Sequence, residues 1–428
     1  EFTEETRAKH FGRFQQLPGC QPEPLAMRYH GHQFRHYNPQ LGDGRGFLFA
    51  QVEDPVDGRL LDFGTKGSGT TPYSRAGDGR LTLKGAVREA LATEMLEALG
   101  VSTSKTFCFF ETGESLFRGD EPSPTRSAVL TRLSHGHIRY GTFQRFQALG
   151  ETANLERLLR YSCATYFPEL WKTQADVALE ELVCAFLREV STRAARLAAS
   201  WMMAGFVHGV LNTDNMNITG ESFDYGPWRF LPFYDPSFTA AYFDHEGLYC
   251  YGRQAEAVYW SLDQLARSLF ALAPEGSETT WHKSLSAALS GFPDVYRREL
   301  VVRFFHRLGL IPTDKVENME IEENLFSLGI AALEESKVPF ESFFFDFHGG
   351  GLRRDRDAGK YAGPEGVKWR NALEDGDWAV SSLADLRLLQ HPDYFSKDLP
   401  EMMLVDEVEK IWEAIDLHDD WSLFEKKI

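Results

Sequence analysis

The clearest pattern of hydrophobic and polar positions in the first third of the chain is an alternation over residues 60–66. One set of alternating positions holds Leu61, Phe63 and Thr65, and the other holds Asp62, Gly64 and Lys66. A period of two predicts a β-strand. A mostly hydrophobic run over residues 47–52 precedes it, and the turn signals Asp54-Pro55 and Asp57-Gly58 separate the two. We therefore expect an antiparallel hairpin over residues 47–66.

Residues 83–99 follow a helical pattern instead. Strong helix formers dominate this segment, and its apolar stripe consists of Leu83, Val87, Leu91, Met95 and Leu99. Gly100 follows directly, at the position where glycine commonly ends a helix. Residues 107–111 and 128–133 are further strand candidates, so the first third predicts several strands and one helix.

From about residue 155 onward the pattern is mostly helical. Its clearest stretch, residues 177–203, keeps helical spacing and ends before Gly205. A polar loop at 208–217 and short strand-like pieces follow, and the chain is then helical again. The sequence predicts an α+β protein in three parts: a small strand-rich N-terminal lobe (1–135), the core of a larger helical C-terminal lobe (136–270) and a helical C-terminal extension (271–428).

Composition narrows the class of protein. The chain has 428 residues, of which 43% are hydrophobic, so a large core in more than one lobe is expected. A formal charge of −18 disfavours nucleic acid as a partner. Five cysteines without a CxxC pair favour neither a disulfide framework nor a zinc site. No apolar run approaches the roughly 18 residues of a membrane span, and no signal-peptide pattern is visible.

Lys66 and Glu89 are the first candidate chemical pair. Lys66 lies on a predicted strand, and Glu89 lies 23 residues later on the predicted helix. Protein kinases use a strand lysine, positioned by a helix glutamate, to hold the phosphates of ATP. A solvated surface pair is the alternative interpretation, and it would be favoured if this pair stood alone.

Two glycine-rich loops flank the lysine strand. Residues 42–46 read Gly-Asp-Gly-Arg-Gly, and residues 77–80 repeat Gly-Asp-Gly-Arg. Glycines allow backbone N–H groups to approach phosphates closely, although a single loop of this kind is usually an ordinary turn. Two copies around the lysine favour a phosphate-binding role.

The most informative segment is residues 208–215. Kinase-like enzymes carry His-x-Asp-x4-Asn there, in which the Asp is the base and the Asn binds magnesium. His208 and Asn215 have this spacing, but Val210 occupies the base position and cannot accept a proton. Nine residues after Asn215, Asp224 begins an Asp-Tyr-Gly triplet that resembles the metal-binding Asp-Phe-Gly of kinases. Asn215 and Asp224 together offer oxygen ligands for a hard cation.

Other residues have two interpretations each. Asp214 is the carboxylate placed to replace the missing base, and an Asx-turn is an equally weighted alternative. Arg132 and Arg139 could converge on phosphate oxygens, whereas isolated arginines are more often surface groups. The histidines at 30, 32 and 36 lack a fourth ligand nearby, so a packing role is favoured over a metal site.

Taken together, the order and spacing of these motifs predict a protein-kinase-like bilobal fold. Longer motifs resemble the selenoprotein O family over roughly residues 25–260. These motifs are Tyr29-His30-Gly31-His32-Gln33-Phe34, residues 39–45, residues 66–75, Gly77-Asp78-Gly79-Arg80, Arg88-Glu89, residues 212–216 and residues 224–227.

The resemblance implies a pseudokinase that binds ATP in a flipped orientation and transfers AMP to Ser, Thr or Tyr hydroxyls of proteins, releasing pyrophosphate. It implies Asp214 as the proton acceptor, Mg²⁺ or Mn²⁺ at Asn215 and Asp224, and Glu89 as the residue that positions Lys66. The residues implied to bind ATP are Gly42, Gly44, Arg45, Lys66, Asp78, Gly79, Arg132, Arg139 and Asp224. It also implies a cytoplasmic location for bacterial members and a mitochondrial one for eukaryotic members.

Two alternatives stay open from the sequence. A conventional kinase with a displaced base would keep the same fold and ligands but transfer the γ-phosphate. A non-catalytic nucleotide-binding pseudokinase would tolerate replacement of Asp214, but it would have less need of both metal ligands.

Overall fold

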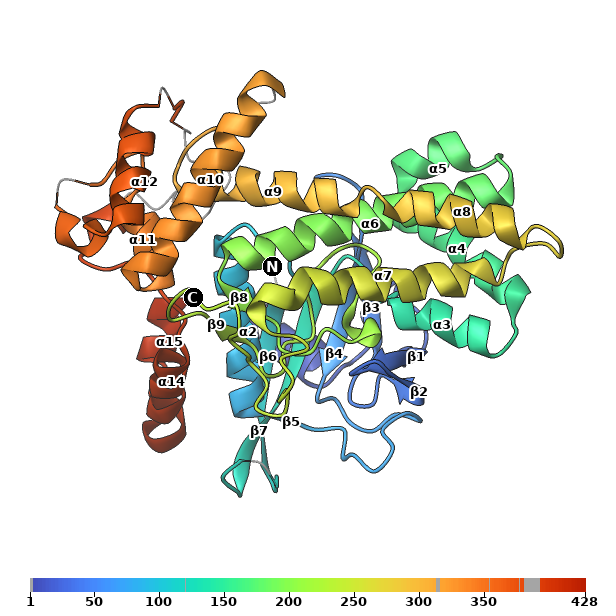
Figure 1. Ribbon diagram of the computed structural model, residues 1–428. Coiled ribbons are helices and arrows are strands. Elements are labelled where there is room, and N and C mark those ends of the chain that lie inside the picture. The colour runs from blue at the N-terminus through green and yellow to red at the C-terminus, as the bar shows by residue number, and fades with distance from the viewer. Residues whose placement is uncertain (1–2, 120, 313–315, 354, 377, 381–392) are drawn as a thin grey trace.

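The computed structural model describes residues 3–119, 121–312, 316–353, 355–376, 378–380 and 393–428 (Figure 1). They form a mixed α+β fold with its main strands in the first third. The strands are β1 (Arg28–Gln33), β2 (His36–Gly42), β3 (Leu48–Glu53), β4 (Leu60–Lys66), β5 (Leu81–Thr82), β6 (Lys105–Leu116), β7 (Thr125–Ser134), β8 (Phe206–Val207) and β9 (Arg229–Phe230). The α-helices are α1 (Glu4–Arg7), α2 (Leu83–Ala98), α3 (Tyr140–Ala148), α4 (Thr152–Tyr166), α5 (Pro168–Gln174), α6 (Leu179–Met203), α7 (Gln254–Phe270), α8 (Glu278–Leu289), α9 (Phe292–Arg307), α10 (Val316–Ser336), α11 (Phe340–Asp346), α12 (Pro364–Glu374), α14 (Val405–His418) and α15 (Ser422–Lys427).

The predicted hairpin is confirmed in the main antiparallel sheet. Strands β3, β4, β7 and β5 follow one another across it, and β6 also pairs with β7. Strand β4 covers the predicted residues, and its alternation separates two faces. Phe63 packs on one face in a hydrophobic cluster with Phe11 and Phe49, so Lys66 lies on the opposite face. The two other predicted strands form parts of β6 and β7.

Helix α2 is also confirmed, and its caps explain its ends. The Thr82 hydroxyl accepts a hydrogen bond from the Gly85 N–H at its start, at 3.1 Å. Gly100 follows its end with a φ of 75°, which glycine adopts without strain. The hydrophobic stripe of α2 is buried, and the helix packs against β6 and β7. Glu89 is therefore held beside the sheet.

The hairpin of β1 and β2 is an element that the hydrophobic pattern did not predict. Its two strands form a sheet of their own with a register shift between Tyr29 and Gly31. The backbone N–H of His32 donates to the Thr213 hydroxyl at 2.7 Å, and that of Phe34 donates to the Asn212 side chain at 3.0 Å. This hairpin therefore braces the polar loop at 208–217.

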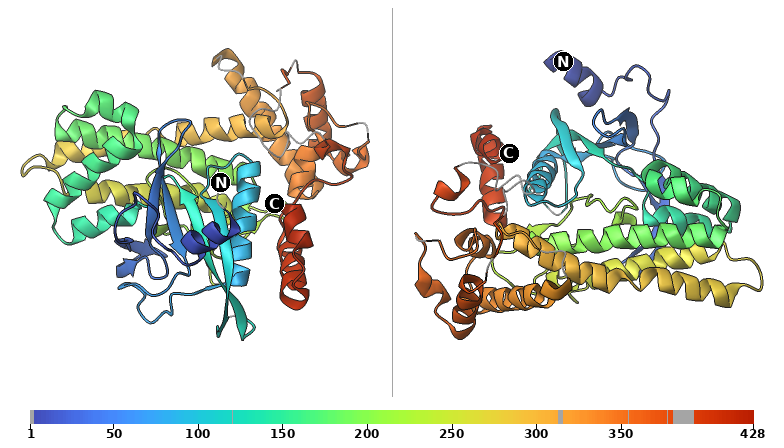
Figure 2. Two further views of the ribbon diagram at one scale, coloured as in Figure 1. Left: turned by 180° about the vertical axis from the view of Figure 1, so that it is seen from behind. Right: turned by 90° about the horizontal axis from the view of Figure 1, so that it is seen from above.

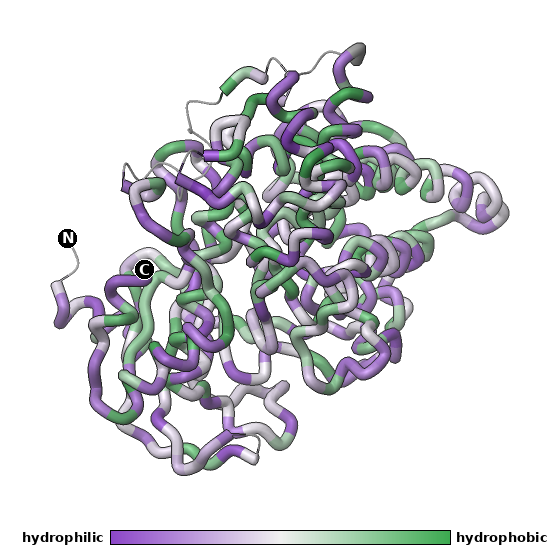
Figure 3. Tube along the Cα trace, turned by 60° about the vertical axis from the view of Figure 1, so that its left-hand side comes forward, coloured by the Kyte–Doolittle hydropathy of each residue, from purple (hydrophilic) through white to green (hydrophobic). Residues whose placement is uncertain are grey.

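The helical region is built around α6, which confirms the long helix expected at 177–203. Helices α7, α8 and α9 pack against α6 (Figures 1 and 2), while the main sheet and α2 lie on one side of this helical layer. Hydrophobic and hydrophilic residues alternate along the helices, as Figure 3 shows, which fits helices with one buried face. The first helix of this region, α3, begins at Tyr140, earlier than the start near residue 155 that the pattern predicted.

The end of the chain returns to the N-terminal region (Figure 2). Glu409 on α14 forms an ion pair with Lys84 on α2 at 2.7 Å, and Asp419 pairs with Arg126 on β7 at 2.8 Å. Part of the stretch expected to be helical, residues 381–392, lies outside the described residues. Within the described ranges, no helix combines the length and the apolar character that a membrane span requires.

Candidate functional site

A polar cavity of about 720 Å³ opens between the main sheet and the loop braced by the β1–β2 hairpin. This volume is in the usual range for small-molecule sites. All of the residues predicted to bind ATP line it, and so does Asp214, the predicted proton acceptor. The predicted ATP-binding residues are Gly42, Gly44, Arg45, Lys66, Asp78, Gly79, Arg132, Arg139 and Asp224. Residues that lie far apart in the sequence thus line one cavity.

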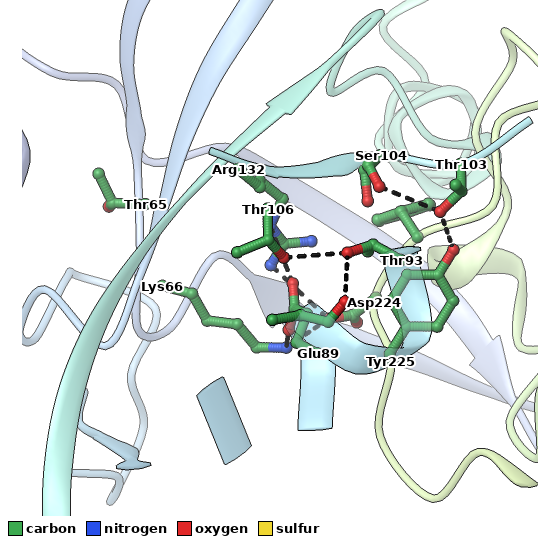
Figure 4. Close-up of polar contacts among 12 residues, drawn as sticks. Thr65, Lys66, Glu89, Thr93, Thr103, Ser104, Thr106, Arg132, Asp224 and Tyr225 are labelled. Atoms are coloured by element: carbon green, nitrogen blue, oxygen red, sulfur yellow. Dashed lines mark hydrogen bonds and ion pairs between the residues drawn. The ribbon is translucent and has the colours of Figure 1, made fainter. Parts of the chain in front are cut away.

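Lys66 and Glu89 meet at the inner wall of this cavity (Figure 4). The Lys66 Nζ lies 2.5 Å from the Glu89 carboxylate, and both side chains are at most 5% exposed. Burial alone would raise the pKa of Glu89, but the charges of Lys66 and Arg132 outweigh it and hold that pKa below its usual value. The surface-pair interpretation therefore does not describe this pair.

Asp224 also lies beside the Lys66 ammonium (Figure 4). Its carboxylate is 3.6 Å from Lys66 Nζ and 4.0 Å from a guanidinium nitrogen of Arg132. Burial opposes ionisation, yet Lys66, Arg139 and Arg132 hold the pKa of Asp224 well below its usual range. Its φ of 64° is rare for a residue with a side chain, and such conformations are concentrated at functional sites. Asp224 is thus a carboxylate that stays charged at neutral pH.

Asp214 has different surroundings in the same cavity. The residue is 7% exposed, and Oδ1 has no hydrogen-bond partner among the described protein atoms. Burial raises the pKa of Asp214 to about 6, although Arg139 and a hydrogen bond from Gln33 act in the other direction. Oδ1 is buried near Gly31, while the residue itself lines the cavity. A carboxylate at a cavity wall that titrates near neutral pH is suited to accept a proton.

Arg139 connects the walls of the site. One guanidinium nitrogen donates to the Asp214 carbonyl oxygen at 2.9 Å, and another lies 3.2 Å from the carboxylate of Asp43 in the first glycine-rich loop. The guanidinium also stacks over the rings of Tyr29 and Phe223, at 4.5 and 4.7 Å. Arg132 and Arg139 therefore do converge on the cavity, as one of the two sequence interpretations expected.

The two glycine-rich loops are packed too closely for larger residues. A Cβ on Gly46 would lie 2.0 Å from the Thr65 carbonyl oxygen, and one on Gly79 would lie 2.2 Å from the backbone of Gly69. Both loops line the cavity, which fits close approach of backbone to a phosphate. Asp78 is half exposed and forms a two-pronged ion pair with Arg118, at 2.8 and 3.2 Å.

Asn215 stands slightly apart from the rest of the predicted set. It is half-buried and is not among the described residues that line the cavity. Its Nδ2 donates a hydrogen bond to the Val210 carbonyl oxygen at 3.0 Å. The amide oxygen of Asn215 takes no part in that bond and points away from it. Among the described residues, no group of three or more His, Cys, Asp or Glu side chains could hold a metal ion.

A cation bound by Asp224 and Asn215 would therefore need further oxygen atoms, supplied by a bound molecule. This arrangement fits magnesium, which is commonly held by one or two protein oxygens together with substrate phosphates.

His208, to which no chemistry was assigned, is buried, and its Nε2 bonds to the Phe223 carbonyl oxygen at 2.9 Å. His30 and His32 bond to Tyr37 and Gln144, which fits the packing role favoured from the sequence.

Several cavity residues escaped the sequence reasoning. They are Tyr29, Asp43, Arg75, Phe117, Arg118 and His137. Arg75 lies within the motif at residues 66–75, and His137 lies between Arg132 and Arg139. Their closeness to these motifs was the one sequence feature that could have pointed to them. Arg118 is brought in by the β6–β7 hairpin, and no sequence signal marks it.

Comparison with known proteins places the chain in a family. The family model described as "Protein adenylyltransferase SelO" matches residues 1–428. A protein of Gloeobacter violaceus named "Protein nucleotidyltransferase YdiU" is 44% identical over 429 residues, covering 98% of this chain and 84% of the relative. A relative of the same name from Synechocystis sp. is 42% identical over 412 residues, covering 94% and 83%. The family match extends well beyond the motifs at 25–260, and the chain belongs to the SelO family of protein adenylyltransferases.

Proposed function

We propose that this protein transfers AMP from ATP to the hydroxyl groups of Ser, Thr or Tyr side chains in other proteins and releases pyrophosphate. The observation that carries the proposal is Asp214: a mostly buried carboxylate with a pKa raised to about 6, in the lining of the same cavity as Lys66 and Asp224. Membership of the SelO family and the relatives' name, protein nucleotidyltransferase, support the reaction class.

The proposal includes a protein-kinase-like bilobal arrangement. Residues 1–135 would form the N-terminal lobe, residues 136–270 the core of the C-terminal lobe and residues 271–428 an extension. Support comes from the lysine strand, the glutamate helix and the loop with Asp214, which stand in kinase order around one cavity.

ATP would lie in this cavity in the flipped orientation, with its α-phosphate beside Asp214. The buried cations Lys66, Arg132 and Arg139 would then hold the phosphates, which suits their charge and depth. Asp224 and Asn215 would hold Mg²⁺ or Mn²⁺. A bound cation of this kind neutralises charge that develops on phosphate oxygens during transfer.

The chemical step follows from this placement. The substrate hydroxyl oxygen forms a bond to the α-phosphorus, and the bond from that phosphorus to the oxygen of pyrophosphate breaks. The Asp214 carboxylate accepts the hydroxyl proton, while Lys66 and the arginines stabilise charge on the departing pyrophosphate. Arg139 keeps Asp214 in place through its bond to the backbone carbonyl.

The test uses ATP labelled separately on its α- and γ-phosphates, with magnesium and a generic protein acceptor. We expect label from the α-phosphate only, and its loss in Asp214→Asn and Asp224→Asn. Asp54→Asn is the matched control, since Asp54 lies in the β3–β4 turn outside the cavity and should leave labelling intact. Label from the γ-phosphate only would show a kinase, and no label with ATP still bound would show a binding scaffold.

A further inference from the structure

His137 lines the cavity, is paired with the carboxylate of Asp62 and has no role in the reaction as described so far. His137 Nδ1 lies 2.9 Å from Asp62 Oδ2, and the two side chains are 13% and 3% exposed. The other oxygen of Asp62 accepts a hydrogen bond from the Gln51 amide at 2.8 Å. Both carboxylate oxygens are thus engaged, and the ring is fixed from one side.

The orientation of the His137 ring follows from strand β4. Asp62, Gly64 and Lys66 alternate along this strand, so they share its cavity face. A Cβ on Gly64 would lie 2.4 Å from His137 Nε2. The imidazole therefore lies over Gly64, with Nδ1 at Asp62 and Nε2 displaced along the strand in the direction of Lys66.

The ring also lies beside Arg132. Gly64 is the pairing partner of Arg132 across β4 and β7, and the same Cβ position would be 3.5 Å from Arg132 Cγ. His137 and Arg132 are thus neighbours, and both line the cavity. Their part of the cavity is at the junction between β7 and the helical region, where the buried cations are gathered.

We infer that His137 is a phosphate ligand, which binds the β- or γ-phosphate of ATP through Nε2 and stays bound to pyrophosphate as it leaves. The inference rests on the proposed function for the orientation of ATP. It follows from charge, because the triphosphate is drawn to Lys66, Arg132 and Arg139, and His137 shares their wall of the cavity. The adenosine end is left to the outer part, which Phe117 and Tyr73 line.

Asp62 determines how the imidazole can act. A carboxylate only accepts hydrogen bonds, so the ring carries a proton on Nδ1. To bond to a phosphate oxygen, Nε2 must carry a proton as well, and the resulting imidazolium is stabilised by Asp62 and by the phosphate. During transfer the electron pair of the broken P–O bond moves onto the leaving oxygen. The N–H bond of His137 stabilises that charge, and the hydroxyl proton still goes to Asp214.

The experiment measures binding of Mg-ATP, Mg-pyrophosphate and AMP to the full chain by titration calorimetry. In His137→Ala we expect the affinities for ATP and pyrophosphate to fall about tenfold or more, because a charge-assisted bond is lost. The affinity for AMP should stay within about twofold. His137→Gln retains an N–H donor and should recover part of the loss.

His135→Gln is the matched control. His135 is also in the junction, with Nδ1 3.4 Å from the carboxylate of Glu221, but it does not line the cavity. It should change none of the three affinities. Equal losses for AMP and ATP in His137→Ala, or no loss for any ligand in a variant whose thermal unfolding is unchanged, would overturn the inference. Pyrophosphate binding does not require AMP transfer, so failure of the labelling test and failure of this test are distinguishable.

Discussion

Asp214 and Asp224 lie ten residues apart in one segment of chain and face one cavity, yet their surroundings affect them in opposite ways. Asp224 lies against Lys66, and its pKa is held well below the usual range. Asp214 is buried with one oxygen unpartnered, and its pKa is raised to about 6. Two carboxylates whose pKa values are pushed apart can divide the work of a reaction between a charged ligand and a base.

The largest expected effect separates catalysis from binding. Asp214→Asn keeps the shape of the side chain but cannot accept a proton, so kcat for AMP transfer should fall about 10³-fold. The affinity for Mg-ATP should change little, because Asp214 does not contact the cation in this assignment. Calorimetry and labelling on the same preparation measure both quantities. A parallel loss of ATP affinity would show that Asp214 acts as a ligand like Asp224.

A substitution at Gly31 should disturb Asp214 and its neighbour Thr213 without contacting Asp224. A Cβ on Gly31 would lie 3.0 Å from Asp214 Oδ1 and 3.1 Å from the Thr213 hydroxyl. Gly31→Ala should therefore shift Asp214 by a few tenths of an ångström and lower kcat about tenfold, less than the roughly 100-fold that a misplacement of about 1 Å can cost.

Gly291→Ala is the control for this substitution, since a Cβ there meets no atom within 4 Å. A kcat in Gly31→Ala equal to that of the wild type would show that Asp214 does not need the position described here.

Stability should respond with opposite signs at the two residues. For Asp214 the folded-state pKa of about 6 exceeds its usual 3.8, so stability is lost as pH rises between those values. At pH 7, Asp214→Asn should therefore stabilise the fold, by up to about 3 kcal/mol. For Asp224 the pKa is lowered, so its ionised form contributes stability at neutral pH, and Asp224→Asn should destabilise the fold. Denaturant unfolding of both variants checks the signs, and equal signs would contradict the comparison.

The two walls of the cavity also differ in how far the sequence could predict them. Strand β4 and helix α2 were predicted to within a residue, because alternation and helical spacing are local properties. The β1–β2 hairpin was missed, since Gly31 and Pro39 interrupt its pattern and its partner is the distant loop at Thr213. Spacing located Asn215 in that loop, but its amide orientation depends on the Val210 carbonyl. Arg118 enters the cavity through tertiary contacts alone, whereas His137 is marked in the sequence by its place between Arg132 and Arg139.

The smallest expected effect concerns the pH dependence of kcat/KM. As the base, Asp214 must be ionised, so kcat/KM should rise with pH through a midpoint near 6. Phosphate groups titrate in the same range, so the midpoint alone is not diagnostic. The Gln33 side chain hydrogen bonds to Asp214 and lowers its pKa. Gln33→Met removes that bond and should move the acid limb to higher pH, with activity at pH 8 within tenfold of the wild type. The pKa of ATP itself is the same in assays of the wild type and of Gln33→Met. An acid limb that does not move would therefore belong to the nucleotide, and it would give no evidence that Asp214 acts as the base.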